Sequence, residues 1–163
     1  MNTPASFSLS DPEMLHHRFM KQALNEAEKA AEAGEVPVGA VIVYNNRIIG
    51  RGHNQVELLT DPTAHAEMIA LSAALEYLGE KYVPDCTLYV TLEPCPMCAG
   101  ALVWAKLGKM VFAALDDKAG SCGSIFNIAA HRTLNHQIEI IHGIMEKESE
   151  HLLSSFFRDL RGG

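Results

Sequence analysis

The residues of this chain best suited to chemistry form two short groups, His65-Ala66-Glu67 and Pro94-Cys95-Pro96-Met97-Cys98. They supply one imidazole and two thiolates, which are good zinc ligands, and one carboxylate, which is a poor fourth ligand. Structural zinc sites fill all four positions with protein ligands, whereas catalytic sites leave one position to water. The pattern therefore predicts one zinc ion per chain, bound by His65, Cys95 and Cys98, with Glu67 moving protons for the water that zinc activates.

The spacing of these residues predicts the local structure that must position them. Cys95 and Cys98 lie three positions apart, so they share a face on the first turn of a helix. His65 and Glu67 lie two positions apart and converge only if His65 lies near a helix cap and Glu67 in the first turn. The turn-forming segment Asp61-Pro62-Thr63 precedes them and fits a helix start. We therefore expect two helix N-termini to meet at the metal, where their positive ends favour thiolates.

Two other kinds of site also use a C-x-x-C pair, namely redox motifs and closed zinc knuckles. The chain has no second C-x-x-C and no H-x-x-x-H to complete a closed site. A redox function would leave His65-Ala66-Glu67 without a role. Of the two remaining cysteines, Cys86 opens an apolar run and is expected in a buried strand, and Cys122 lies in a glycine-flanked loop. An open, catalytic metal site is the favoured interpretation.

Length and composition are those of a single globular domain, because 163 residues that are 48% hydrophobic can bury a substantial core. We expect a flexible tail over residues 1–9 and one domain over residues 10–163. No apolar run approaches the roughly 18 residues of a membrane span, and a secretory signal is lacking. These features predict a cytoplasmic protein without membrane contact. The formal charge of −7 argues against a DNA-binding protein that grips a long backbone, but it permits capture of a short RNA loop in a pocket.

Alternating helical and extended patterns predict an α/β fold, a three-layer α/β/α sandwich with a mixed five-stranded sheet. A capping-box spacing at 10–13 predicts the start of a helix that continues to Gly34. Asn45-Asn46 predicts a hairpin turn. The strands are expected over residues 38–44, 47–52, 87–92, 110–115 and 138–141, with helices starting near 65 and 95 and a last helix over 146–160.

The pattern H-x-E…P-C-x-x-C is the signature of the zinc nucleobase deaminases. From about Phe19 to Arg161 the chain resembles the bacterial tRNA-specific adenosine deaminases, the TadA family of the cytidine deaminase-like superfamily. The metal motif fits the whole superfamily, whereas Asn54, the tract 61–67 and the terminal Phe156-Phe157-Arg158 narrow the match to the tRNA enzymes. The other matching segments are 35–41, 45–47, 91–101 and 135–136.

The resemblance implies zinc-dependent hydrolytic deamination of adenosine to inosine at the wobble position of a tRNA anticodon, by a cytoplasmic homodimer. It assigns the zinc ligands and the proton-transferring acid to the residues named above. It also implies that Asn54 hydrogen-bonds the flipped base, that Val36 lines the pocket and that Asp116 contacts the ribose region. The residues implied to face the anticodon loop or to order the terminal helix are Asn135, His136, Phe157 and Arg158.

Two departures from the family pattern and three alternatives accompany this resemblance. Leu115 stands where some family members have an arginine, and the chain ends at Arg161-Gly162-Gly163 without the basic tail that some members carry. We therefore expect recognition to depend more on the pocket than on general attraction to RNA. The alternatives are a guanine deaminase or other free nucleobase or nucleoside deaminase, a cytidine or deoxycytidylate deaminase, and an inactive zinc-binding RNA module. The presence of Glu67 argues against the inactive module.

Overall fold

In a computed structural model of the protein, which describes residues 11–162, five strands form one mixed sheet. The strands are β1 (Gly39–Tyr44), β2 (Arg47–His53), β3 (Thr87–Leu92), β4 (Lys109–Ala114) and β5 (Glu139–His142), in the spatial order β2-β1-β3-β4-β5. Strand β1 pairs antiparallel with β2 and β3, whereas β3 with β4 and β4 with β5 are parallel. The predicted mixed five-stranded sheet is confirmed. The tail predicted for residues 1–9 lies outside the described residues.

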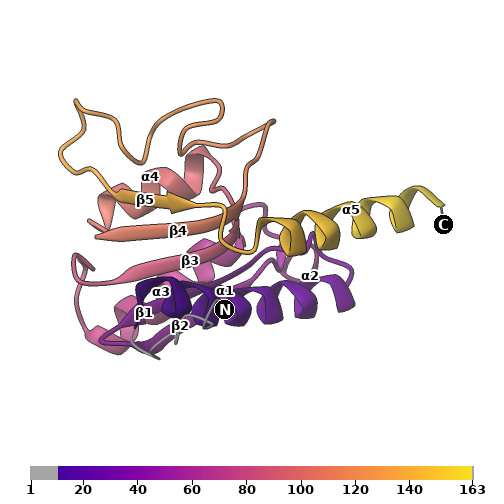
Figure 1. The fold of residues 1–163 in the computed structure, drawn as a ribbon, viewed down its shortest axis with the longest axis horizontal. Coiled ribbons are helices and arrows are strands. Elements are labelled where there is room, and N and C mark those ends of the chain that lie inside the picture. The colour runs from indigo at the N-terminus through magenta and orange to yellow at the C-terminus, as the bar shows by residue number, and fades with distance from the viewer. Residues whose placement is uncertain (1–10, 163) are drawn as a thin grey trace, which may run out of the picture.

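Helices lie on both sides of this sheet, as the three-layer prediction requires (Figure 1). They are α1 (Pro12–Glu32), α2 (Val56–Leu59), α3 (Ala66–Leu78), α4 (Pro96–Trp104) and α5 (Glu146–Gly162). Helix α1 packs on one face of the sheet and helices α3 and α4 on the other. Helix α5 starts beside α1 and then extends past the sheet towards the C-terminus (Figure 1). Within residues 11–162, no helix combines the length and the apolar character that crossing a bilayer requires.

The central strands are buried on both faces because helices cover both sides of the sheet. Successive side chains of a strand point to opposite sides and so enter two different cores. In β1, Ile42 belongs to the core beneath α3 and α4, whereas Val41 belongs to the core beneath α1. The same alternation in β4 places Phe112 in the core beneath α3 and α4 and Val111 in the core beneath α1. This double burial explains why the strands read as continuous apolar runs, as expected where helices cover both sides of a sheet.

Local structure agrees with the sequence at the hairpin and differs at the start of α1. Asn45 and Asn46 have φ values of 51° and 59°, as the predicted two-residue hairpin turn requires. The predicted capping box placed the start of the first helix at Ser10, but the N-cap is Asp11, whose side chain accepts a hydrogen bond from the backbone N–H of Glu13. The cap falls there because Pro12 directly follows it, and the fixed φ of proline suits the first helical position.

Glycine allows α3 to lie directly on β2, which fixes where the His65 helix begins. A Cβ atom added to Gly52 would lie 2.4 Å from the carbonyl oxygen of Ala66 and 2.8 Å from the backbone nitrogen of Ala70. Both neighbours are backbone atoms of α3 and cannot rotate away. A side chain at Gly52 would therefore push the first turns of α3 off the sheet.

We predict that Gly52→Ala lowers the free energy of unfolding by roughly 2–3 kcal/mol, because an overpacked core forces the backbone to shift. The matched control is Gly100→Ala in α4, where an added Cβ meets open space. There the helix propensity of alanine should raise stability by up to about 1 kcal/mol. Urea unfolding of both variants checks this, and equal midpoints for Gly52→Ala and the wild type would contradict it.

Candidate active site

The starts of two helices bring His65, Cys95 and Cys98 together. His65 is the N-cap of α3, Cys95 is the N-cap of α4, and Cys98 follows in the first turn of α4. The Nδ1 atom of His65 lies 3.6 Å from Sγ of Cys95 and 3.5 Å from Sγ of Cys98. The three ligand atoms all lie within 4.8 Å of one another. The meeting of two helix N-termini, expected from the spacing, is confirmed, and the group is able to bind a metal ion.

The two thiols are too close for both to carry a negative charge without a cation. The thiol of Cys98 donates to Cys95 and holds the pKa of Cys95 at about 4. This same hydrogen bond, together with burial, raises the pKa of Cys98. A hydrogen bond with Cys95 raises the pKa of His65 against the opposing effect of burial. A divalent cation between the ligands would favour the thiolate form of both cysteines and the neutral form of the imidazole.

Glu67 lies in the first turn of α3 with 4% of its surface exposed. Burial raises the pKa of its carboxyl group, although its own backbone N–H stabilises the charged form. Glu67 lines the same cavity as His65 and Cys95. A carboxyl group with a raised pKa beside a metal-binding group is suited to accepting and donating protons.

The cavity has a volume of about 540 Å³, which lies in the range of roughly 300–1,000 Å³ typical of small-molecule sites. The three residues predicted to bind substrate, Val36, Asn54 and Asp116, all line it. Helix α5 adds two apolar side chains, Phe156 and Leu160. The structure thus brings the predicted proton carrier, two of the predicted metal ligands and the predicted substrate-binding residues into one cavity.

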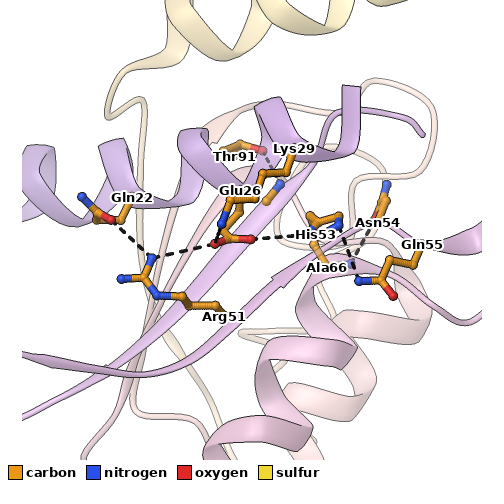
Figure 2. A network of polar contacts seen from close by, with 10 residues as sticks. Gln22, Glu26, Lys29, Arg51, His53, Asn54, Gln55, Ala66 and Thr91 are labelled. Atoms are coloured by element: carbon orange, nitrogen blue, oxygen red, sulfur yellow. Dashed lines mark hydrogen bonds and ion pairs between the residues drawn. The ribbon is translucent and has the colours of Figure 1, made fainter. Parts of the chain in front are cut away.

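Asn54 connects two walls of this cavity through its side-chain amide. Its Oδ1 atom accepts from the backbone N–H of Ala66 at 2.9 Å, a contact drawn in Figure 2. Its Nδ2 atom donates to the carbonyl oxygen of Val36 at 3.1 Å. Asn54 therefore holds the first residue of α3 to the segment before β1. No acceptor within residues 11–162 takes the second hydrogen of its amide group.

A buried acid in α1 holds the end of β2 beside Asn54 (Figure 2). Glu26 is 4% exposed and contacts Lys29 at 2.9 Å, His53 at 3.3 Å and Arg51 at 3.8 Å. Burial alone would raise the pKa of Glu26, but hydrogen bonds from Lys29 and His53 bring it below the ordinary value. This network ties α1 to the residue that directly precedes Asn54.

Four residues implied to contact RNA lie away from the cavity lining. Asn135 is exposed, and His136 donates from Nε2 to the carbonyl oxygen of Leu107 at 2.6 Å, so it anchors the loop that precedes β5. Phe157 and Arg158 are exposed on α5, whereas their neighbour Phe156 faces the cavity. Contact of these residues with RNA stays a prediction.

Two buried acids of the cavity had no role predicted from the sequence. Glu35 and Glu93 are each 2% exposed. The carboxylate of Glu35 accepts from the backbone N–H groups of Glu57 and Leu58, both at 2.9 Å, and so caps the short helix α2, which was also not predicted. Glu93 accepts hydrogen bonds from the loop that follows β4, part of which also lines the cavity. The signal in the sequence that could have indicated these roles is an acidic residue next to an apolar strand.

Comparison with known proteins places this fold and site in a class. A family model described as MafB19-like deaminase matches residues 14–161. A solved structure from a study of A-to-I editing by tRNA:A34 deaminases at the wobble position of transfer RNA superposes with a TM-score of 0.80 and 41% sequence identity, covering 83% of this chain and 99% of that one. The chain therefore has the deaminase fold that the sequence predicted.

Curated relatives narrow the class to one family. The tRNA-specific adenosine deaminase of Aquifex aeolicus is 53% identical over 88% of this chain and 94% of its own length. The tRNA-specific adenosine deaminase of Bacillus subtilis is 49% identical over 88% of this chain and 89% of its own length. At this identity and coverage, the chain belongs to the tRNA-specific adenosine deaminase family.

We predict that the protein binds one metal ion per chain and that Cys98→Ala loses it, because the variant removes one of three ligand atoms. The matched control is Cys86→Ala, which removes a buried thiol outside the metal-binding group. Metal analysis of the purified proteins checks this. Two ions per chain, or full metal content in Cys98→Ala, would show that the site has been assigned wrongly.

Proposed function

We propose that this protein deaminates adenosine to inosine at the wobble position of a tRNA anticodon, by hydrolysis at a zinc site. The observation that carries this proposal is that Glu67 shares one cavity with His65 and Cys95, two members of the group of three residues that could hold a metal ion. Three protein ligands leave a fourth position open, as in catalytic rather than structural zinc sites. The names of the relatives supply the substrate class.

The geometry of the ligand group fits zinc. In a tetrahedral site with Zn–S near 2.3 Å and Zn–N near 2.0 Å, a nitrogen and a sulfur ligand lie about 3.5 Å apart. The distances from Nδ1 of His65 to the sulfurs of Cys95 and Cys98 are 3.6 and 3.5 Å. Zinc held by His65, Cys95 and Cys98 would supply Lewis-acid activation of a water molecule.

Glu67 then does the proton transfers. It accepts a proton from the attacking water and delivers it to N1 of adenine, while the water oxygen bonds to C6. The carboxylate next takes the proton of the new hydroxyl group on C6 and passes it to the amino group. The C6–N bond then breaks, the C6 oxygen becomes the carbonyl of inosine, and ammonia leaves. Burial favours the neutral form of this carboxyl group, so the carboxylate of Glu67 takes up a proton more readily than that of an exposed acid, as the first step requires.

The cavity walls suit a single extruded nucleotide. Asn54 has one amide hydrogen left for a purine acceptor, and Val36, which is 36% exposed, offers apolar surface to the ring. Asp116 also lines the cavity and would contact the ribose. Bases of an anticodon loop are already unstacked in part, so extrusion costs less than from a duplex.

Further contacts belong to the same proposal. Asn135, His136, Phe157 and Arg158 would face the anticodon loop, or order the helix that does. The protein would act as a homodimer in the cytoplasm. Trp104, at the end of α4, supports a subunit contact, because 82% of its surface is exposed in the single chain and large exposed aromatic residues are typical of protein interfaces.

We predict that Glu67→Ala retains its metal and binds tRNA but deaminates at least about 10²–10⁴-fold more slowly, since the carboxylate moves protons and ligates nothing. Glu76→Ala removes an exposed acid from the same helix and serves as the control. Metal analysis, tRNA binding and single-turnover inosine formation check this. Loss of metal in Glu67→Ala alone would mean that Glu67 is a ligand.

We predict that an anticodon stem-loop with adenosine at the wobble position reacts with a kcat/KM at least roughly 100-fold above that of free adenosine. The cavity grips one nucleotide only, and contacts remote from the reacting atoms supply much of the orientation. With a chain charge of −7, the salt dependence should be shallower than that of a protein making many phosphate contacts.

The same assay distinguishes the alternative. Free guanine, cytidine and a stem-loop with guanosine at the wobble position are included as substrates, and inosine and ammonia are measured. Turnover of free guanine without inosine in the adenosine stem-loop would assign the protein as a guanine deaminase instead.

A further inference from the structure

Glu93 is a buried acid that the chemistry described above does not use. It follows β3 directly, precedes the metal-binding segment of α4 by two positions, and is 2% exposed. None of the ion pairs within residues 11–162 includes it. A buried carboxylate without a cationic partner requires hydrogen-bond donors to offset the loss of water.

A single loop supplies those donors. The Oε1 atom of Glu93 accepts from the backbone N–H of Asp116 at 3.1 Å and from the hydroxyl of Ser124. Its Oε2 atom accepts from the backbone N–H groups of Cys122 and Ser124 at 3.0 and 3.1 Å. These four hydrogen bonds connect one side chain to both ends of the segment 116–124.

The segment is folded closely around this carboxylate. A Cβ atom added to Gly120 would lie 2.5 Å from Cδ of Glu93, so the loop backbone passes directly against the acid. The side chain of Asp116 accepts from the backbone N–H groups of Lys118 and Ala119, which makes the tight turn at the loop's start. Among the described residues, no other charged side chain accepts hydrogen bonds from this loop except its own Asp116. The remaining hydrogen bond to the site joins the backbone N–H of Ser121 to the carbonyl oxygen of Pro94.

The loop held by Glu93 is one wall of the cavity. Asp116 and Ala119 line it together with Glu93, and Val36 and Val56 also line it. The backbone N–H of Asp116 donates to Glu93, and Glu93 is joined to Cys95 along the chain through Pro94. The position of Asp116 relative to the metal-binding group therefore depends on this short connection.

We propose that Glu93 is a positioning residue that sets the distance between the substrate-binding wall carrying Asp116 and the metal-binding start of α4. The consequence for substrate rests on the proposed function, because Asp116 is assigned there to the ribose of the target nucleotide. The role of Glu93 in holding the loop stands independently of that function. Loss of the acceptor should weaken substrate binding more than it slows the chemical step.

The test compares three variants. Glu93→Gln keeps the shape of the side chain but replaces one acceptor oxygen with an NH₂ group that faces N–H donors. Ser124→Ala removes only the hydroxyl donor, and Ser124 is exposed, so this variant carries the test even where Glu93→Gln does not fold. Glu32→Gln makes the same change of charge on the exposed side of α1 and is the control.

Three quantities are measured on the full chain: the metal content, amide hydrogen exchange by NMR, and KM and kcat with the adenosine stem-loop. For Glu93→Gln we expect the metal content to be unchanged and the amides of Asp116, Cys122 and Ser124 to exchange about tenfold faster or more. We expect KM to rise about tenfold while kcat changes by less than about threefold, as for the loss of hydrogen bonds to a charged acceptor. Ser124→Ala should shift both exchange and KM in the same direction by a smaller factor.

Three results would overturn the proposal. The first is unchanged exchange in residues 116–124, and the second is faster exchange there with unchanged KM. The third is faster exchange throughout α3 and β3 with loss of metal, which would make Glu93 a general stability residue. Should the wild-type protein form no inosine, the proposed function fails, and the exchange data still decide whether Glu93 holds the loop.

Discussion

Two helices begin at one point beside the sheet, and the rest of the site depends on where each of them starts. His65 caps α3 and Cys95 caps α4, with their ligand atoms 3.6 Å apart. Because a helix turns by about 100° per residue, a start displaced by one position would turn the metal ligands away from one another. The structure fixes both starts. Pro96 suits the first position of α4, and the start of α3 is held by the close approach of Gly52 and the hydrogen bond from Ala66 to Asn54.

Four buried glutamates show how the surroundings decide what an acid can do. Glu26 has cationic partners, Glu35 accepts from the start of α2, and Glu93 accepts from the loop after β4. Glu67 is stabilised less, because the hydrogen bonds from its own backbone and from the thiol of Cys98 do not offset its burial, and its pKa is raised. The first three carboxylates hold pieces of structure together. Only Glu67 combines a raised pKa with a place beside the metal ligands, which is what proton transfer requires.

The sequence predicted best the features that depend on neighbouring residues. The strand at Thr87–Leu92 and the turn at Asn45-Asn46 follow from local patterns. The C-x-x-C pair limits the residues that could bind a metal to a few candidates. Helix α2 was missed because four residues with exposed leucines have no helical periodicity. The roles of Glu35 and Glu93 were missed because their donors lie 22 to 31 positions further along the chain. Contacts at that separation leave no pattern in a single sequence.

The acidic character of the chain constrains how it could hold an RNA loop under the proposed function. A charge of −7 opposes long-range attraction to phosphates, but screening confines such effects to about 8 Å at physiological salt. Several acids, among them Glu35, Glu93 and Asp116, line the cavity, so phosphate groups are not favoured there. Apolar side chains are available there instead, with Phe156 and Leu160 of α5 lining the cavity. Stacking of a base on an aromatic side chain contributes roughly 1–3 kcal/mol. Binding energy would therefore come from bases placed against α5 and inside the cavity. The nucleotides that provide the affinity would then be the same ones that the site must orient.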